Sequence, residues 1–268
     1  MSKGKSKVSG RTAPSPIPQP QPQPQQQPQG PISTYDDFIK SASQTDTYGD
    51  FLKLTEDERF AIIDDIITNQ RNITVPNYLD GSETTKVMYA LGLNNKATVV
   101  TDAQLDAMQG RELFRTVYEH GSMPPPSSDA ILDQIKNGEY TQMSGVGGSA
   151  HGRAIYFATD YHGSAIYGHG ERNAQVMRAK IAPTAKVVRE SNLSAQMTSK
   201  PWFVSKGWHI NGTDQKAIFA ISQGIDGWYS GSYTMIINRG ALVASSTNKT
   251  VRSGRGYATS WSTANKAR

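Results

Sequence analysis

The sequence predicts an α+β protein in which a small helical region precedes a domain of short strands. Apolar residues recur at helical spacing up to about residue 110, and short β-branched or aromatic runs bounded by Gly, Pro, Ser and Asn follow. These strands do not alternate regularly with helices, which favours α+β over a doubly wound sheet. Only 36% of the 268 residues are hydrophobic, so we expect part of the chain to remain unfolded.

Residues 1–33 are predicted to form a disordered Pro/Gln-rich tether. Between Pro14 and Pro31 lie eight of the 14 prolines and seven glutamines. Proline lacks an amide hydrogen and restricts φ, so this composition favours polyproline II or disorder. We interpret the segment as a spacer rather than an SH3 ligand, because no basic residue closely flanks the prolines. The folded part is expected to begin near Ile32.

Residues 34–110 are predicted to form the helical region. Thr55 and Glu58 have the spacing of a capping box, and Phe60, Ile63 and Ile67 then repeat on one helical face. Further helices are expected over residues 82–93 and from residue 101 to Gly110. These segments carry no chemical motif, so we expect them to pack against the domain that follows.

Residues 111–245 are predicted to form the strand-rich domain, followed by a basic tail over residues 246–268. A helix is expected over residues 128–136, where Ile131, Leu132 and Ile135 face inward and Gly138 ends the helix. The predicted strands cover residues 113–118, 154–158, 175–181, 186–189 and 233–238.

Charge is unevenly distributed along the chain. The 28 basic and 23 acidic residues give a net +5, which divides into +4 over residues 1–33, −6 over residues 34–190 and +7 over residues 191–268. No glutamate follows Glu190. The basic stretch from Lys249 to Arg268 contains Tyr257 and Trp261, which suits either nucleic-acid binding or a solvated tail.

Several classes of protein are excluded by missing features. The chain has no cysteine, which excludes disulfides, thiol nucleophiles and Cys-ligated metals. It has no apolar run of about 18 residues and no apolar leader, so we expect neither a membrane span nor signal-directed export. We therefore expect the protein to stay in a cytoplasm or to be carried inside a particle.

Known catalytic and binding motifs are also missing. None of the five histidines pairs at helical i, i+4 spacing, so no metal site is expected, and no G-x-S-x-G elbow is present. The G-x-G-x-x-A run at residues 145–150 precedes a strand rather than a helix, which predicts a loop and not a dinucleotide fingerprint.

The most informative segment covers residues 152–167. It predicts a buried strand ending at Ala158, a turn, and a short helix that presents Ser164 and Tyr167 on one face. Two tyrosines and a hydroxyl beside a glycine-rich loop suit a flat aromatic ligand, which would stack on a tyrosine and accept a hydrogen bond from the serine. The alternative is that the tyrosines are ordinary core residues.

This segment resembles the nicotinamide-binding signature of the ADP-ribosyltransferase superfamily, in its poly(ADP-ribose) polymerase-like form. The matching residues are Tyr156-Phe157-Ala158 and, after five residues, Ser164-Ala165, then Tyr167. The runs at residues 113–117, 178–188 and 224–242 resemble other strands of these domains, especially those encoded by tailed bacteriophages. The resemblance covers residues 111–243, about half the chain.

The resemblance implies a split-sheet fold that binds NAD between two small sheets and passes ADP-ribose to a protein or nucleic-acid acceptor. It implies that an Arg or His on the first strand holds NAD while the next residue's backbone grips the nicotinamide amide. Arg115 with Thr116 suits this position by strand context, and His120 in His-Gly-Ser is the competitor. We prefer Arg115 because a buried apolar strand surrounds it.

The remaining site residues also follow from the resemblance. Tyr167 would stack on nicotinamide, Ser164 would bond its amide, and Tyr156 would line the pocket. The catalytic glutamate position falls on Ser232, which carries no charge. Losing that carboxylate costs on the order of 10²-fold in rate. Asp226 is interpreted as a turn residue and a poor substitute.

Three hypotheses follow. The first is an NAD-dependent ADP-ribosyltransferase in which Arg115, Tyr167 and Ser232 occupy the catalytic positions. The second is a catalytically inactive protein with this fold, acting as a phage structural or host-interaction protein. The third is nucleic-acid binding through the basic C-terminal stretch.

Overall fold

The computed structural model describes residues 30–43, 45–69, 73, 82–93, 96–119, 127–138, 154–168, 171–200 and 212–251. The chain divides into two units, residues 1–31 and 32–268, and every element below belongs to the second. This unit is mixed α and β, as predicted, with helices around one eight-stranded mixed sheet. Residues 1–29, His120, the loop at 145–150 and residues 252–268 lie outside the described part.

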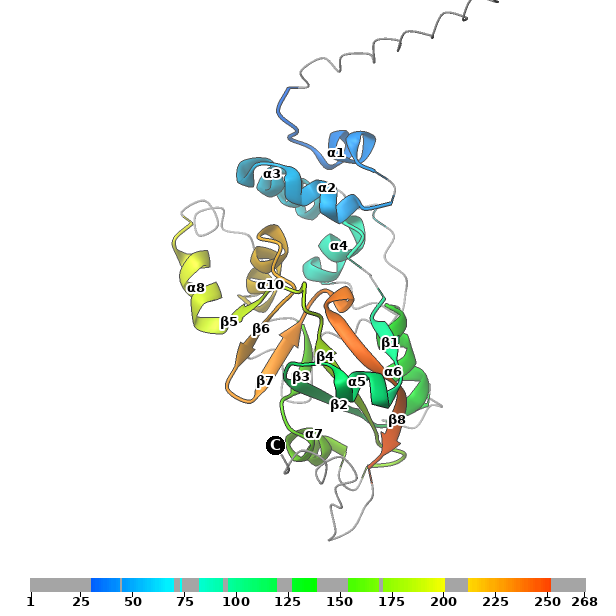
Figure 1. Ribbon diagram of the computed structural model, residues 1–268. Coiled ribbons are helices and arrows are strands. Elements are labelled where there is room, and N and C mark those ends of the chain that lie inside the picture. The colour runs from blue at the N-terminus through cyan, green and yellow to red at the C-terminus, as the bar shows by residue number, and fades with distance from the viewer. Residues whose placement is uncertain are drawn as a thin grey trace, which may run out of the picture. The chain divides into compact units, whose positions relative to one another are not determined.

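The helical region begins with four helices, α1 (Tyr35–Ser41), α2 (Thr47–Lys53), α3 (Glu56–Thr68) and α4 (Glu83–Ala90). The predicted capping box at α3 is confirmed, because Thr55 and Glu58 each accept the other's backbone N–H. Ser82 caps α4 in a similar way through the backbone N–H of Thr85. Figure 1 shows α1, α2 and α3 together at one end of this unit.

The sheet consists of eight strands in the order β1-β8-β4-β2-β3-β7-β6-β5. β1 pairs with β8 and β5 with β6 in parallel, whereas the other neighbours are antiparallel. The strands are β1 (Thr98–Val100), β2 (Glu112–Val117), β3 (Ile155–Ala158), β4 (Gln175–Ile181), β5 (Val187–Arg189), β6 (Gly227–Ser230), β7 (Tyr233–Ile236) and β8 (Leu242–Thr250).

Further helical segments lie between the strands. They are α5 (Asp102–Ala107), α6 (Ser128–Asn137), α7 (Tyr161–Ala165), η1 (Ile166–Gly168), α8 (Glu190–Thr198), α10 (Gly212–Ser222) and η2 (Arg239–Ala241). The predicted helix over residues 128–136 corresponds to α6. It ends at Gly138, which has a φ of 78° and therefore the left-handed conformation that glycine adopts without strain.

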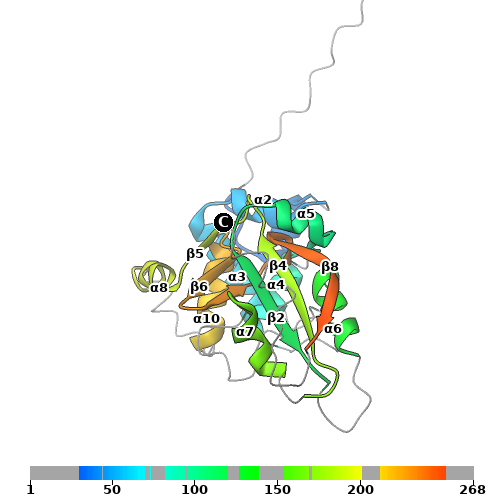
Figure 2. The same ribbon diagram turned by 60° about the horizontal axis from the view of Figure 1, so that its bottom comes forward.

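Two apolar cores lie on opposite faces of β2 and β4, because side chains alternate along a strand. The main core joins helices and sheet, and includes Phe38, Ile63, Leu113, Leu132, Phe157, Met177 and Trp228. The second core is small and consists of Phe114, Ala165, Ala174, Val176 and Val251. We call the face that carries the second core the outer face. Figure 2 shows β2, β4 and β8 running side by side.

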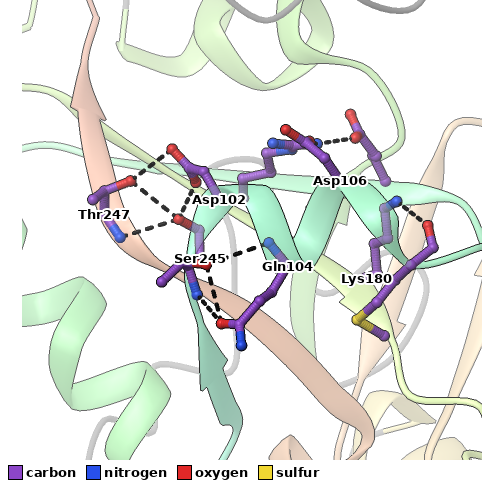
Figure 3. Close-up of polar contacts among 10 residues, drawn as sticks. Asp102, Gln104, Asp106, Lys180, Ser245 and Thr247 are labelled. Atoms are coloured by element: carbon purple, nitrogen blue, oxygen red, sulfur yellow. Dashed lines mark hydrogen bonds and ion pairs between the residues drawn. The ribbon is translucent and has the colours of Figure 1, made fainter.

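Away from the second core, polar contacts hold α5 on the outer face (Figure 3). Asp102 accepts hydrogen bonds from the hydroxyls of Ser245 and Thr247 on β8, and Asp106 pairs with Arg178 on β4. Burial raises the pKa of Asp102, but these hydroxyls and the nearby cations outweigh burial and leave its pKa below the usual range. Asp102 therefore holds α5 as an anion.

Several elements differ from the sequence-based expectation. The helix expected from residue 101 to Gly110 ends at Ala107, and β8 continues to Thr250, past the boundary placed after residue 245. β1, β6, β8, α8 and α10 were not predicted as elements. β8 is rich in Ser, Thr and Asn, residues that are typical of loops, and it is extended because β1 and β4 flank it.

A buried phenol connects the helical region to the rest of the unit. The Tyr48 hydroxyl on α2 donates to the Ile221 carbonyl on α10 at 2.8 Å. Burial and, to a lesser extent, the charge of Asp226 raise the pKa of Tyr48 above its ordinary value of 10.0. Because the unfolded phenol ionises first, this group stabilises the fold fully below pH 10 and less as the pH rises above it.

We expect Tyr48→Phe to lower the free energy of unfolding by about 1 kcal/mol at neutral pH, because the Ile221 carbonyl loses its phenol donor. The variant should also lose less stability than the wild type above pH 10. Urea denaturation across this pH range measures both effects. Tyr89→Phe removes an exposed phenol and serves as the control. Equal alkaline losses in wild type and Tyr48→Phe would contradict the prediction.

Candidate functional site

The two halves of the sheet meet at β2 and β3, which share one registered residue pair, Phe114 with Ala158. Beyond this pair β2 and β3 separate from each other, and each keeps only its neighbour on the other side. Arg115 pairs with Met177 on β4, whereas Tyr156 pairs with Met235 on β7. The sheet is therefore continuous in order but is divided into β1-β8-β4-β2 and β3-β7-β6-β5 at this junction.

Arg115 bridges the junction. Its side chain is 7% exposed, and its Nη1 donates to the Tyr156 carbonyl across the gap at 2.8 Å. Arg115 shares a strand face with Leu113 and Val117, which belong to the main core, so it points away from the outer face. In this structure Arg115 thus supplies the hydrogen bond that a backbone amide supplies elsewhere in a sheet.

The side chain of Thr116 points to the outer face of the sheet, where it contacts α7. Its Oγ1 lies 2.8 Å from Oγ of Ser164, which is 2% exposed. The strand–turn–helix order predicted for residues 152–167 is confirmed, because β3 ends at Ala158 and α7 begins at Tyr161. Asp160 caps α7 by accepting from the backbone N–H of Gly163 at 2.6 Å. Ser164 is thereby directed at β2.

Apolar contacts fix α7 and η1 on β2. Ala165 of α7 lies in the second core, and the Tyr161 ring packs edge-on against Phe114 with centroids 6.0 Å apart. Gly168 ends η1 in close contact with the strand. A Cβ at this position would lie 2.7 Å from both Thr116 Cγ2 and Ala174 Cβ, so the backbone approach requires glycine.

Tyr167 forms the second polar contact between α7–η1 and the sheet. Its phenol lies 2.9 Å from the phenol of Tyr233, the first residue of β7. This hydrogen bond, together with partial burial, raises the pKa of Tyr167 to about 12. Tyr167 remains 37% exposed, so its ring stays accessible to a ligand.

The sequence analysis did not single out Tyr233, although the register explains its role. Tyr233 lies opposite Ala158 on β3, and Tyr156 shares its face of the β3–β7 pair, two residues along. The signal available in the sequence was the position of Tyr233 directly after Ser232 at the start of a strand. The role of Tyr233 could not be recognised without knowing that β7 is the strand that pairs with β3.

Ser232 lies exposed in the turn between β6 and β7. Its carbonyl accepts from the backbone N–H of Thr159 at 2.9 Å, which places the turn beside the end of β3. Asp226 already has two partners: one of its oxygens accepts from Lys186 N and the other from Asn238 Nδ2, each at 2.7 Å. Asp226 was interpreted as a turn residue, but it lies beyond the turn at residues 223–224 and directly before β6, where it joins Lys186 before β5 to Asn238 after β7.

Of the seven predicted site residues, six lie in the described part, on β2, β3, η1, α7 and the β6–β7 turn, and His120 lies outside it. Thr116 contacts Ser164 on the outer face, whereas Arg115 contacts the Tyr156 backbone from the main-core side. Whichever of Thr116 and Ser164 donates, the pair keeps one hydroxyl hydrogen and several lone pairs for a ligand, which complements a carboxamide. Within the described ranges, no group of three His, Asp or Glu side chains is arranged to hold a metal. No described helix is long and apolar enough to cross a membrane.

Comparisons with protein families, with curated proteins and with solved structures find no match to this chain.

Thr116→Val should lower the free energy of unfolding by about 1–2 kcal/mol, because it leaves the buried Ser164 hydroxyl without its partner. Thr116→Ser keeps the hydroxyl and loses one methyl, so we expect a cost below about 1 kcal/mol. Urea denaturation of both variants separates the hydroxyl contact from packing. Equal losses would show that the Thr116–Ser164 contact contributes nothing.

Proposed function

We propose that this chain binds NAD at the junction of β2 and β3 and transfers ADP-ribose to a protein or nucleic-acid acceptor. The observation that carries the proposal is a set of three contacts among residues of the signature segments. Thr116 contacts Ser164, Arg115 contacts the Tyr156 backbone, and Tyr167 contacts Tyr233. These contacts join β2 to β3 and α7, and η1 to β7, so segments that are distant in the sequence are neighbours around the junction.

The sheet architecture gives independent support. An ADP-ribosyltransferase-like domain would consist of two small sheets with NAD between them. Here two four-stranded halves share a single residue pair, and α7 lies over the junction on the outer face. The candidate ligand-binding side chains Thr116, Ser164 and Tyr167 lie near this junction.

The residues suggest how the substrate would be held. The Thr116–Ser164 hydroxyl pair would bond the nicotinamide carboxamide, and Tyr167 would stack on its ring beside Tyr156. Arg115 would act indirectly, by fixing β3 against β2. In the reaction, the electron pair of the bond between ribose and nicotinamide leaves with neutral nicotinamide. The acceptor's nucleophilic atom then bonds the ribose carbon and loses its proton to solvent.

Ser232 makes the reaction slow in this proposal. A carboxylate at that position would stabilise the positive charge that develops on the ribose, whereas a serine hydroxyl contributes only a neutral hydrogen bond. The acceptor or NAD itself would then have to supply the missing stabilisation.

The uncharged side chain at Ser232 also favours a second candidate. This candidate is an inactive NAD-binding module that is part of a phage particle or bound to a host protein. Asp226 accepts hydrogen bonds from Lys186 and Asn238, and Glu190 pairs with Lys216 of α10, so both carboxylates already have structural partners.

Radiolabelled NAD incubated with the purified protein and a bacterial lysate tests the first candidate. We expect labelled acceptor bands with the wild type and none with Tyr167→Ala, because that variant lacks the stacking ring. If no band forms but NAD raises the Tm of the wild type and not of Tyr167→Ala, the binding module is correct. If NAD neither labels an acceptor nor raises the Tm, both candidates are wrong.

Ser232→Glu should raise NAD hydrolysis on the order of 10²-fold, because it restores a carboxylate beside the ribose. Nicotinamide release measures the rate. Ser230→Glu places the same charge at the other side of the turn and is the control. Equal rates for the two variants, with NAD still bound, would show that Ser232 is not the catalytic position.

A further inference from the structure

Tyr167 needs an anchor if its ring is to stack on a ligand. It lies on η1, a single short turn, and is 37% exposed beside Ile166, which is 66% exposed. An exposed side chain on a short turn samples several rotamers, and binding must then select one of them at an entropic cost. The backbone of η1 is fixed by Gly168 against β2, but that contact does not set the direction of the Tyr167 ring.

Tyr233 has the rigidity that Tyr167 lacks. It is the first residue of β7, where it pairs with Ala158 of β3 on one side and with Ser230 of β6 on the other. Its side chain is partly buried against the main core. A phenol on a strand with neighbours on both sides is a stable point of attachment, and this phenol lies 2.9 Å from that of Tyr167.

We infer that Tyr233 is a positioning residue, whose phenol fixes the Tyr167 ring in the orientation that stacks on a flat aromatic ligand. This inference rests on the proposed NAD site. Because Tyr233 directly follows Ser232, the anchor of the stacking ring is adjacent in sequence to the position that would lie nearest the ribose.

Three phenylalanine substitutions test this role while keeping each ring. Tyr233→Phe should weaken NAD binding about three- to tenfold, because Tyr167 loses its hydrogen bond but keeps its ring. Tyr167→Phe should weaken binding by a similar factor. The double variant should be no weaker than either single one, because both substitutions remove the same bond. Tyr229→Phe, on the neighbouring strand β6, is the matched control and should leave the affinity unchanged.

Calorimetry with NAD measures the affinities, and NMR titration of isotope-labelled tyrosine reports the bond directly. The Tyr167 signal is assigned by its loss in Tyr167→Phe. In Tyr233→Phe the pKa of Tyr167 should fall from about 12 toward its ordinary value of 10.0, because the phenol partner is gone. A merely structural role for Tyr233 would change stability without this selective shift.

The outcomes separate the inference from the proposed function. If the wild type binds NAD and Tyr233→Phe binds it equally well, the positioning role is wrong and the NAD site stands. An unchanged Tyr167 titration, or a double variant that loses the product of the two single factors, also overturns the role. If the wild type binds no NAD, the proposed function fails and the positioning role fails with it, whatever the titration shows.

Discussion

The single residue pair between β2 and β3 is the constraint on which the site depends. Strands that separate after one pair leave backbone groups in the middle of a sheet without a strand partner, and burying such groups unpaired is costly. Arg115 meets this need by donating to the Tyr156 carbonyl from within the main core. The divergence can persist because a side chain replaces the missing backbone contact.

The outer face is held by two kinds of contact. Near the junction, the second core fixes α7 and η1 on β2, and the close approach at Gly168 leaves little freedom to shift. Farther along β4, Asp102, Asp106 and Glu112 hold α5 through Ser245, Thr247 and Arg178. The desolvation cost of burying the Arg178 charge is offset because Arg178 pairs with two carboxylates, those of Asp106 and Glu112. Both helices thus rest on the same four-stranded half.

The candidate site is built from neutral groups. Its hydroxyls and phenols already bond one another in pairs, Thr116 with Ser164 and Tyr167 with Tyr233. Such pairs suit a flat, uncharged amide better than an anion, and they keep the polar groups satisfied before a ligand arrives. Ser232 carries no negative charge, so under the proposed function the site would have groups for binding but lack the carboxylate that would speed the chemistry.

Local signals in the sequence determined the elements whose stability is local. The capping box before α3, the glycine that ends α6 and the strand–turn–helix order from β3 to α7 each depend on residues a few positions apart, and the structure has all three. Only the tertiary structure decided that Arg115 faces the main core, that Tyr233 meets Tyr167, and that the polar β8 runs on to Thr250. These features depend on which strands become neighbours, and that pairing joins residues tens of positions apart.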